Sequence, residues 1–161
     1  MGTRRSVHPL LLEPTYWRSR LGELGEQRPS LLLTPRPELC GGGRDVVEFR
    51  IRTHDGEALW GLLARPTLRA GPWPARIRSV GPAALLTVNH RWVEDGGAEF
   101  VFQQAAGRKL EDRVLDVVHV SRMAFHTEGI DRFRVTYPPP CRGLDLDEFR
   151  IAEQLFDGKF C

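Results

Sequence analysis

The strongest constraint on the fold is an amphipathic stretch between residues 107 and 129. Small and apolar side chains recur there every three or four residues, which predicts a helix of about five turns with one side facing a core. Gly129 predicts the end of this helix, because glycine readily takes the left-handed conformation that ends many helices. We expect Arg113, Asp116 and Arg122 to face water on the other side. The core side consists of Leu110, Val114, Val117, Val118, Ser121, Ala124 and Phe125.

A strand is predicted directly after this helix, over Arg132–Tyr137. Apolar and polar residues alternate along it, and three consecutive prolines from Pro138 onward end it because proline cannot donate a hydrogen bond to a neighbouring strand. A helix that leads into a strand and then a turn is typical of α/β proteins. Their functional sites lie beyond the carboxyl ends of the strands.

A β-hairpin is predicted upstream, between residues 45 and 65. Asp45–Arg52 alternates in polarity, 53–56 contains an Asp-Gly pair suited to a tight turn, and Glu57–Arg65 returns as a second strand that Pro66 ends. This hairpin is the clearest local pattern in the chain.

The remaining segments give weaker patterns. Leu31–Leu33 is a brief extended piece, and Gly41–Gly43 reads as a flexible joint. We expect a loop over Thr67–Pro82, with a short extended piece at Ala75–Val80 as the alternative. Apolar runs predict a buried strand at Ala83–Val88 and a strand or helix start at Phe100–Gln103, separated by a turn at 94–97. Further helices are predicted over Pro14–Glu26 and in the tail after Gly143.

Length and composition favour one domain over residues 1–161, with a helix and irregular segment at 1–44 and an α/β core at 45–161. The net charge of +2 comes from 23 basic and 21 acidic residues without a basic run, so we expect no nucleic-acid partner. The only leucine run near the start is too short for a signal peptide or a membrane span. The three cysteines, Cys40, Cys141 and Cys161, match neither a disulfide framework nor a zinc site, which favours the cytoplasm. We expect no cofactor and no metal.

Two stretches resemble a known family. Val46–Pro66, preceded by Tyr16 and Trp17 in a first helix, and the sequence LEDRVLDVVHVSRMAFHTEGIDRFRV from Leu110 resemble parts of α/β-hydrolases of the acetyl xylan esterase and dienelactone hydrolase type. Together they cover roughly half of the chain. The resemblance implies an α/β fold, here a small three-layer mixed sheet like that of a shortened α/β-hydrolase with an N-terminal β-hairpin.

The resemblance also indicates where a nucleophile would lie. In that family the strand runs into a Gly-x-Ser-x-Gly or Gly-x-Cys-x-Gly turn. Here the corresponding sequence is Pro139-Pro140-Cys141-Arg142-Gly143, which places Cys141 at the nucleophile position but Pro139 at the first glycine, while Pro140 lacks a backbone N–H. The family's acid and histidine follow the nucleophile, and only eighteen residues follow Gly143, so we expect an incomplete triad.

The candidate catalytic residues are therefore Cys141 with His119 or His126, or with His90, as the base that would lower the thiol pKa. His119 and His126 are also readily explained as surface or core histidines, and their spacing of two helical turns is too long for two ligands of one metal. Turn chemistry accounts for His54 and Asp55. The start and outer face of a helix account for Glu111, Asp112 and Asp116.

The function predicted from these observations is a non-catalytic or degenerate α/β-hydrolase-like domain that acts in binding or assembly. A homo-oligomer or a protein partner is expected, because a shortened sheet exposes an apolar edge or face. One alternative is an esterase or thioesterase that uses Cys141. A second alternative is an unrelated α+β interaction module, which predicts that the hairpin and the strand at Arg132–Tyr137 do not share one sheet.

Overall fold

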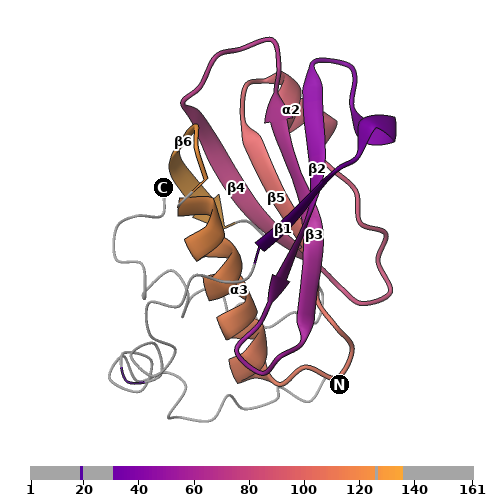
Figure 1. Cartoon of the computed structure of the whole chain (residues 1–161), viewed down its shortest axis with the longest axis vertical. Helices are drawn as coiled ribbons and strands as arrows, with labels where there is room; N and C mark the ends of the chain where they lie inside the picture. Colours follow the sequence, from indigo (N-terminus) through magenta and orange to yellow (C-terminus); the bar gives the residue numbers. More distant parts are fainter. Residues whose placement is uncertain (1–18, 20–30, 126, 136–161) are drawn as a thin grey trace, which may run out of the picture.

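The structure, a computed structural model, describes residues 19, 31–125 and 127–135. It contains one six-stranded sheet in the order β1-β2-β3-β5-β4-β6 (Figure 1). The predicted tail helix after Gly143 lies outside the described residues, and so does the predicted helix over Pro14–Glu26 apart from Ser19. The strands are β1 (Leu31–Pro35), β2 (Arg44–Arg52), β3 (Ala58–Pro66), β4 (Trp73–Val80), β5 (Ala98–Gln103) and β6 (Ile130–Val135).

The predicted hairpin is present as strands β2 and β3. The two strands pair antiparallel along their whole length, from Arg44 opposite Pro66 to Arg52 opposite Ala58. Gly56 has a φ of 83° in the turn between them, a conformation that favours glycine. Strand β1 adds antiparallel to the outer side of β2, so the brief extended piece predicted at Leu31–Leu33 is an edge strand of the sheet.

The other half of the sheet is parallel and centres on β4, which pairs with β5 on one side and β6 on the other. The predicted loop over Thr67–Pro82 is therefore wrong between residues 73 and 80, where the alternative of an extended piece is nearer the structure. The sequence favoured a loop because glycine and proline are frequent between residues 67 and 82. Arg76 and Arg78 lie within the strand. Both arginines form ion pairs with Glu99 of β5, a partner that local sequence does not indicate.

The predicted strand at Ala83–Val88 is absent, since residues 81–89 form an irregular connection. Leu85 within this segment is 81% exposed. Strand β5 already has β3 and β4 as its neighbours, so the sheet offers no interior position to this apolar run. The prediction of a strand at Phe100–Gln103 is confirmed by β5.

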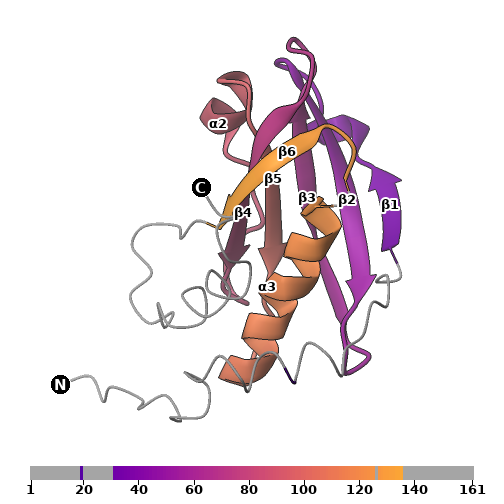
Figure 2. The same cartoon turned by 90° about the vertical axis from the view of Figure 1, so that its left-hand side faces the viewer.

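Helices cover both faces of the sheet and give the expected three layers (Figure 2). Helix α3 (Leu110–Phe125), the predicted amphipathic helix, packs on one face against a core that includes Phe49, Ile77 and Phe100. The short helix α2 (His90–Glu94) and the 3-10 turn η2 (Pro37–Leu39) lie on the other face, where Val93 and Leu39 pack on a second cluster. Gly129 has a φ of 85° just before β6, in agreement with its predicted place after the helix.

The hairpin and β6 belong to one mixed sheet, which excludes the reading of this chain as an unrelated α+β module. Within the described ranges, no helix has both the length and the apolar character needed to cross a membrane.

Candidate functional site

Two histidines and three aspartates meet where the β2–β3 turn contacts α3: His54, His119, Asp55, Asp112 and Asp116. The turn is closed by backbone hydrogen bonds from Thr53 N to Glu57 O at 2.9 Å and from Gly56 N to Thr53 O at 3.0 Å. The Thr53 hydroxyl donates to the Asp55 carboxylate and fixes the turn further. This rigid turn presents His54 and Asp55 to the helix.

His54 connects the turn to two residues of α3. Its Nε2 lies 3.0 Å from Asp112 Oδ1, and its backbone N–H donates to His119 Nε2 over 3.2 Å. The two imidazole rings stack, with centroids 5.8 Å apart and planes 12° from parallel. The prediction that turn chemistry accounts for His54 is therefore incomplete, because tertiary contacts also hold this side chain.

Arg108 lies beside this pair and joins the same two elements. It donates to Asp55 of the turn and makes two bonds to Asp116 of the helix, from Nη2 at 2.6 Å and from Nε at 3.1 Å. Burial alone would raise the pKa of Asp55, but its hydrogen bonds from Arg108 and Thr53 outweigh burial and hold that pKa well below its ordinary value.

The expectation that Asp116 faces water is wrong, since only 1% of this residue is exposed. Helical periodicity places Asp116 outside the apolar side, but the hairpin turn and Arg108 cover that position. The bidentate pair then compensates the loss of hydration. The burial of Asp116 thus depends on the β2–β3 turn, which lies more than fifty residues earlier in the chain.

The chemistry open to this cluster follows from its protonation. Burial, together with smaller contributions from His54 and Arg122, lowers the pKa of His119 to about 4, so the ring is neutral at pH 7. Its Nε2 is occupied by the backbone N–H of His54, and the Nδ1 atoms of both rings are buried with no hydrogen-bond partner among the described residues. Neither ring forms a hydrogen bond with a Ser, Thr or Cys side chain among the described residues, so the cluster presents a base without a hydrogen-bonded nucleophile.

Three side chains of this cluster also have metal-ligand chemistry. Ligand atoms of His54, Asp55 and Asp112 all lie within 4.8 Å of one another. Arg108 already donates to the Asp55 carboxylate, however, so a divalent ion would have to displace a guanidinium that also binds Asp116. The arrangement is that of an ion-paired clamp between turn and helix.

Of the three predicted catalytic residues, the structure describes only His119, in α3; Cys141 and His126 lie outside the described residues. His90, the further candidate, begins α2 on the opposite face of the sheet. The structure brings His119 together with His54, a pairing that the sequence does not indicate because the two residues are 65 positions apart.

A second polar feature lies on the α2 face. Glu99 is fully buried and accepts 2.8 Å hydrogen bonds from Arg76 and Arg78 and a 3.0 Å bond from the backbone N–H of Asn89. The Arg76 guanidinium also lies 5.1 Å from the centre of the Trp92 ring. The sequence did contain one indication of this buried ion pair, because a glutamate within the apolar strand sequence AEFVFQ needs a partner when it is buried.

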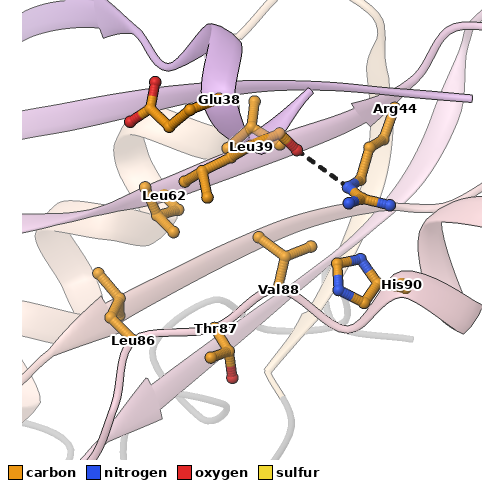
Figure 3. A pocket seen from close by; sticks show the side chains of 9 residues that line it. Glu38, Leu39, Arg44, Leu62, Leu86, Thr87, Val88 and His90 are labelled. Carbon is orange, nitrogen blue, oxygen red and sulfur yellow. Dashed lines mark hydrogen bonds between the residues drawn. The ribbon is translucent and has the colours of Figure 1, made fainter. Parts of the chain in front are cut away.

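These bonds hold the segment before α2, which forms one wall of a pocket of about 210 Å³ (Figure 3). The opposite wall comes from η2 and the start of β2, and β3 forms part of the lining. The lining residues are Glu38, Leu39, Arg44, Val46, Leu62, Leu86, Thr87, Val88 and His90.

A wider hollow on the sheet is lined by Arg36, Glu48, Arg50, Ala58 and Trp60. Its charges are already paired with one another, because Glu48 accepts from Arg36 at 2.7 Å and from Arg50 at 2.8 Å. Hydrogen bonds from Arg50 and Arg36 outweigh burial and lower the pKa of Glu48. This hollow therefore offers a ligand little uncompensated charge.

With this architecture the chain is similar in fold to α/β-hydrolase esterases. Acetyl xylan esterase 1 from Thermoanaerobacterium sp. JW/SL YS485 superposes with a TM-score of 0.66 and 16% identity, over 88% of this chain and 55% of the esterase. Acetyl xylan esterase from Paenibacillus sp. R4 gives a TM-score of 0.64 and 12% identity, over 76% of this chain and 50% of the esterase.

The chain thus spans about half the length of these esterases. No family model matches the sequence, and no curated protein matches it at the sequence level. The likeness establishes a shortened α/β-hydrolase-like fold, as the sequence resemblance implies. Because the sequence identities are this low, the comparison supports a similarity of fold and not of activity.

Proposed function

We propose that this chain is a non-catalytic α/β-hydrolase-like domain that acts in assembly, by pairing with a second copy of itself through the edge strand β1. The observation that carries the proposal is the exposure of three consecutive leucines on this strand: Leu31 is 44% exposed, Leu32 59% and Leu33 50%.

The non-catalytic part is supported by the roles of the histidines. His54 and His119 are tied to each other, to Asp112 and to the hairpin turn, in an arrangement that stabilises the packing of turn on helix. A general base needs a nitrogen within reach of the group that it deprotonates. Among the described residues, Asp112 and the backbone N–H of His54 occupy one nitrogen of each ring.

The assembly part is supported by the chemistry of the edge. Strand β1 pairs only with β2 among the described strands, so the backbone groups on its other side have no strand partner in that part of the chain. Edge strands that avoid pairing with other chains carry charged side chains or bulges. Strand β1, with the sequence LLLTP, has no charged residue and only a terminal proline. Figure 2 shows β1 at the edge of the sheet. Two such strands related by a twofold axis would pair antiparallel and continue the sheet from one copy into the next.

Sedimentation velocity of the full chain over a concentration series tests the assembly. A five-residue strand buries less surface than a standard protein interface, so we expect a dimer with a dissociation constant of about 1 μM. Leu32→Lys places a charge on the edge and should give a monomer throughout the series.

Leu85→Lys is the matched control, because Leu85 is 81% exposed but lies outside the sheet. This variant should dimerise like the wild type. A wild type that stays monomeric over the whole series, or equal loss of dimer in both variants, would refute pairing through β1.

The enzyme alternative, an esterase or thioesterase with Cys141 as its nucleophile, is favoured only by the names of the similar structures. Iodoacetamide labelling followed by peptide mass analysis separates the two proposals. A thiolate nucleophile would label at Cys141 much faster than Cys40 and Cys161, with loss of the fast phase in Cys141→Ala. We expect slow labelling of all three cysteines.

A further inference from the structure

We propose that the pocket between η2 and the segment before α2 binds a small apolar carboxylate, such as a short-chain fatty acid or an aromatic acid, with its carboxylate group at Arg44 and His90. This site concerns the α2 face and does not rest on dimerisation through β1.

The walls are apolar over most of their length. Val46 and Leu62 on the sheet are buried, and Leu39, Leu86 and Val88 pack against the same cluster from the two flanking segments. A volume of about 210 Å³ is below the range of about 300–1,000 Å³ that is usual for drug-sized ligands. The pocket therefore suits an apolar group of a few carbon atoms or a single ring.

The polar groups gather at one end. Figure 3 shows the Arg44 guanidinium and the His90 ring facing each other there. Arg44 Nε donates to Leu39 O at 3.0 Å, which orients the side chain, while its terminal nitrogens form no hydrogen bond or ion pair with the described residues. Two parallel N–H groups of an arginine match the two oxygens of a carboxylate.

The acidic residue of the lining does not cancel this charge. The Glu38 side chain points away from Arg44 in Figure 3 and pairs with Arg36 instead. A carboxylate ligand would thus supply the partner that Arg44 lacks in the described chain. The charged end of the pocket favours an anionic group, and its apolar walls favour an apolar body on the same ligand.

The pocket is also preformed. Glu99 accepts the backbone N–H of Asn89 at 3.0 Å, and Arg78 donates to the carbonyl oxygen of Thr87, so buried charges fix the wall at residues 87–89. A site that needs no ordering on binding loses less of its interaction energy to conformational entropy.

Calorimetric titration of the full chain with hexanoate tests the proposal, with 1-hexanol as the neutral ligand of the same length. We expect saturable binding of hexanoate with a dissociation constant of about 1 mM or lower and at least tenfold weaker binding of hexanol. Arg44→Gln should weaken hexanoate about tenfold, whereas Arg52→Gln, an exposed arginine of the same strand, should leave it unchanged.

Amide chemical shifts of the wild-type chain locate the site without any substitution. Hexanoate should perturb the signals of Leu62 and Val88 and leave Ile51, on the opposite face, unperturbed.

The proposal is overturned if hexanoate and benzoate show no saturable binding up to about 10 mM. It is equally overturned if hexanol binds as tightly, if Arg52→Gln weakens binding as much as Arg44→Gln, or if the shifts fall on the α3 face. A chain that is monomeric but binds hexanoate at these residues would refute the dimer and leave this site intact.

Discussion

Glu99 shows how one residue can organise a whole face of the sheet. Its carboxylate is fully buried, yet it accepts bonds from Arg76, Arg78 and the backbone of Asn89. A buried charge is tolerated only when its partners replace the lost water, and these partners come from β4 and from the connection to α2. The residue thus fixes both strand β4 and the pocket wall.

Removing the charge of Glu99 should therefore destabilise the folded protein. We expect Glu99→Gln to lower the free energy of unfolding by about 3 kcal/mol, because it leaves two arginines facing a neutral amide. Urea denaturation measures this change. Glu94→Gln, at an exposed glutamate of α2, should alter the free energy by less than about 0.5 kcal/mol. Equal effects of the two substitutions would contradict the assigned role of Glu99.

His119 should make stability depend on pH. Its pKa is about 4 in the folded protein against an ordinary value of 6.5. Above pH 6.5 the ring is neutral in both states, so it adds no pH dependence. As the pH falls from 6.5 to 4 the unfolded chain binds a proton that the folded protein excludes, and the free energy of unfolding should fall by about 3 kcal/mol. His54, Arg122 and Arg108 strengthen this effect, and Asp55 opposes it.

Chemical denaturation at pH 7 and pH 4.5 checks this dependence. His119→Gln keeps an acceptor for the backbone N–H of His54 but cannot titrate, so its loss of stability between the two pH values should be much smaller. His90→Gln changes an exposed histidine and should retain the wild-type dependence. A His119→Gln variant with the full dependence would contradict the low pKa of His119.

At the scale of elements, β3 is held between two strands at a position that admits only glycine. An added Cβ at Gly61 would lie 2.3 Å from Val101 O, 2.5 Å from the Phe49 ring and 2.9 Å from Phe102 Cα. Two of these atoms belong to the backbone of β5, which cannot move without breaking the ladder. The close approach of β3 and β5 therefore depends on this residue.

We expect Gly61→Ala to lower the free energy of unfolding by about 3 kcal/mol through overpacking. Gly81→Ala is the control, because nothing lies within 4 Å of the added Cβ there. Thermal unfolding followed by circular dichroism compares the two. A Gly61→Ala variant as stable as Gly81→Ala would show that β3 and β5 can separate without cost.

At the scale of the whole molecule, one sheet carries both cores. The single domain over residues 1–161 stays a prediction. Trp73 packs against the core beneath α3, and Trp92 packs on the opposite face. Unfolding by urea should then be one cooperative transition, with coincident midpoints for tryptophan fluorescence and far-ultraviolet circular dichroism. Two separate transitions would indicate that the chain folds as two units.

The elements with clear local periodicity could be predicted from the sequence alone. The hairpin at β2 and β3 and the amphipathic helix α3 form because their apolar residues recur with periods of two and 3.6, and Gly56 and Gly129 supply the conformations that end them. These elements carried the resemblance to α/β-hydrolases, and the fold is similar to that of acetyl xylan esterase 1. Local pattern sufficed because each of these segments buries its own apolar side.

The tertiary structure alone decided the features that depend on distant charges. Strand β4 lies inside the sheet with its two arginines paired to Glu99, and Asp116 is buried in an ion pair with Arg108. The pairing of His54 with His119 and the pocket at Arg44 likewise join segments far apart in the chain. Compensation of a buried charge requires a partner in space, and spacing along a sequence does not record which partner that is.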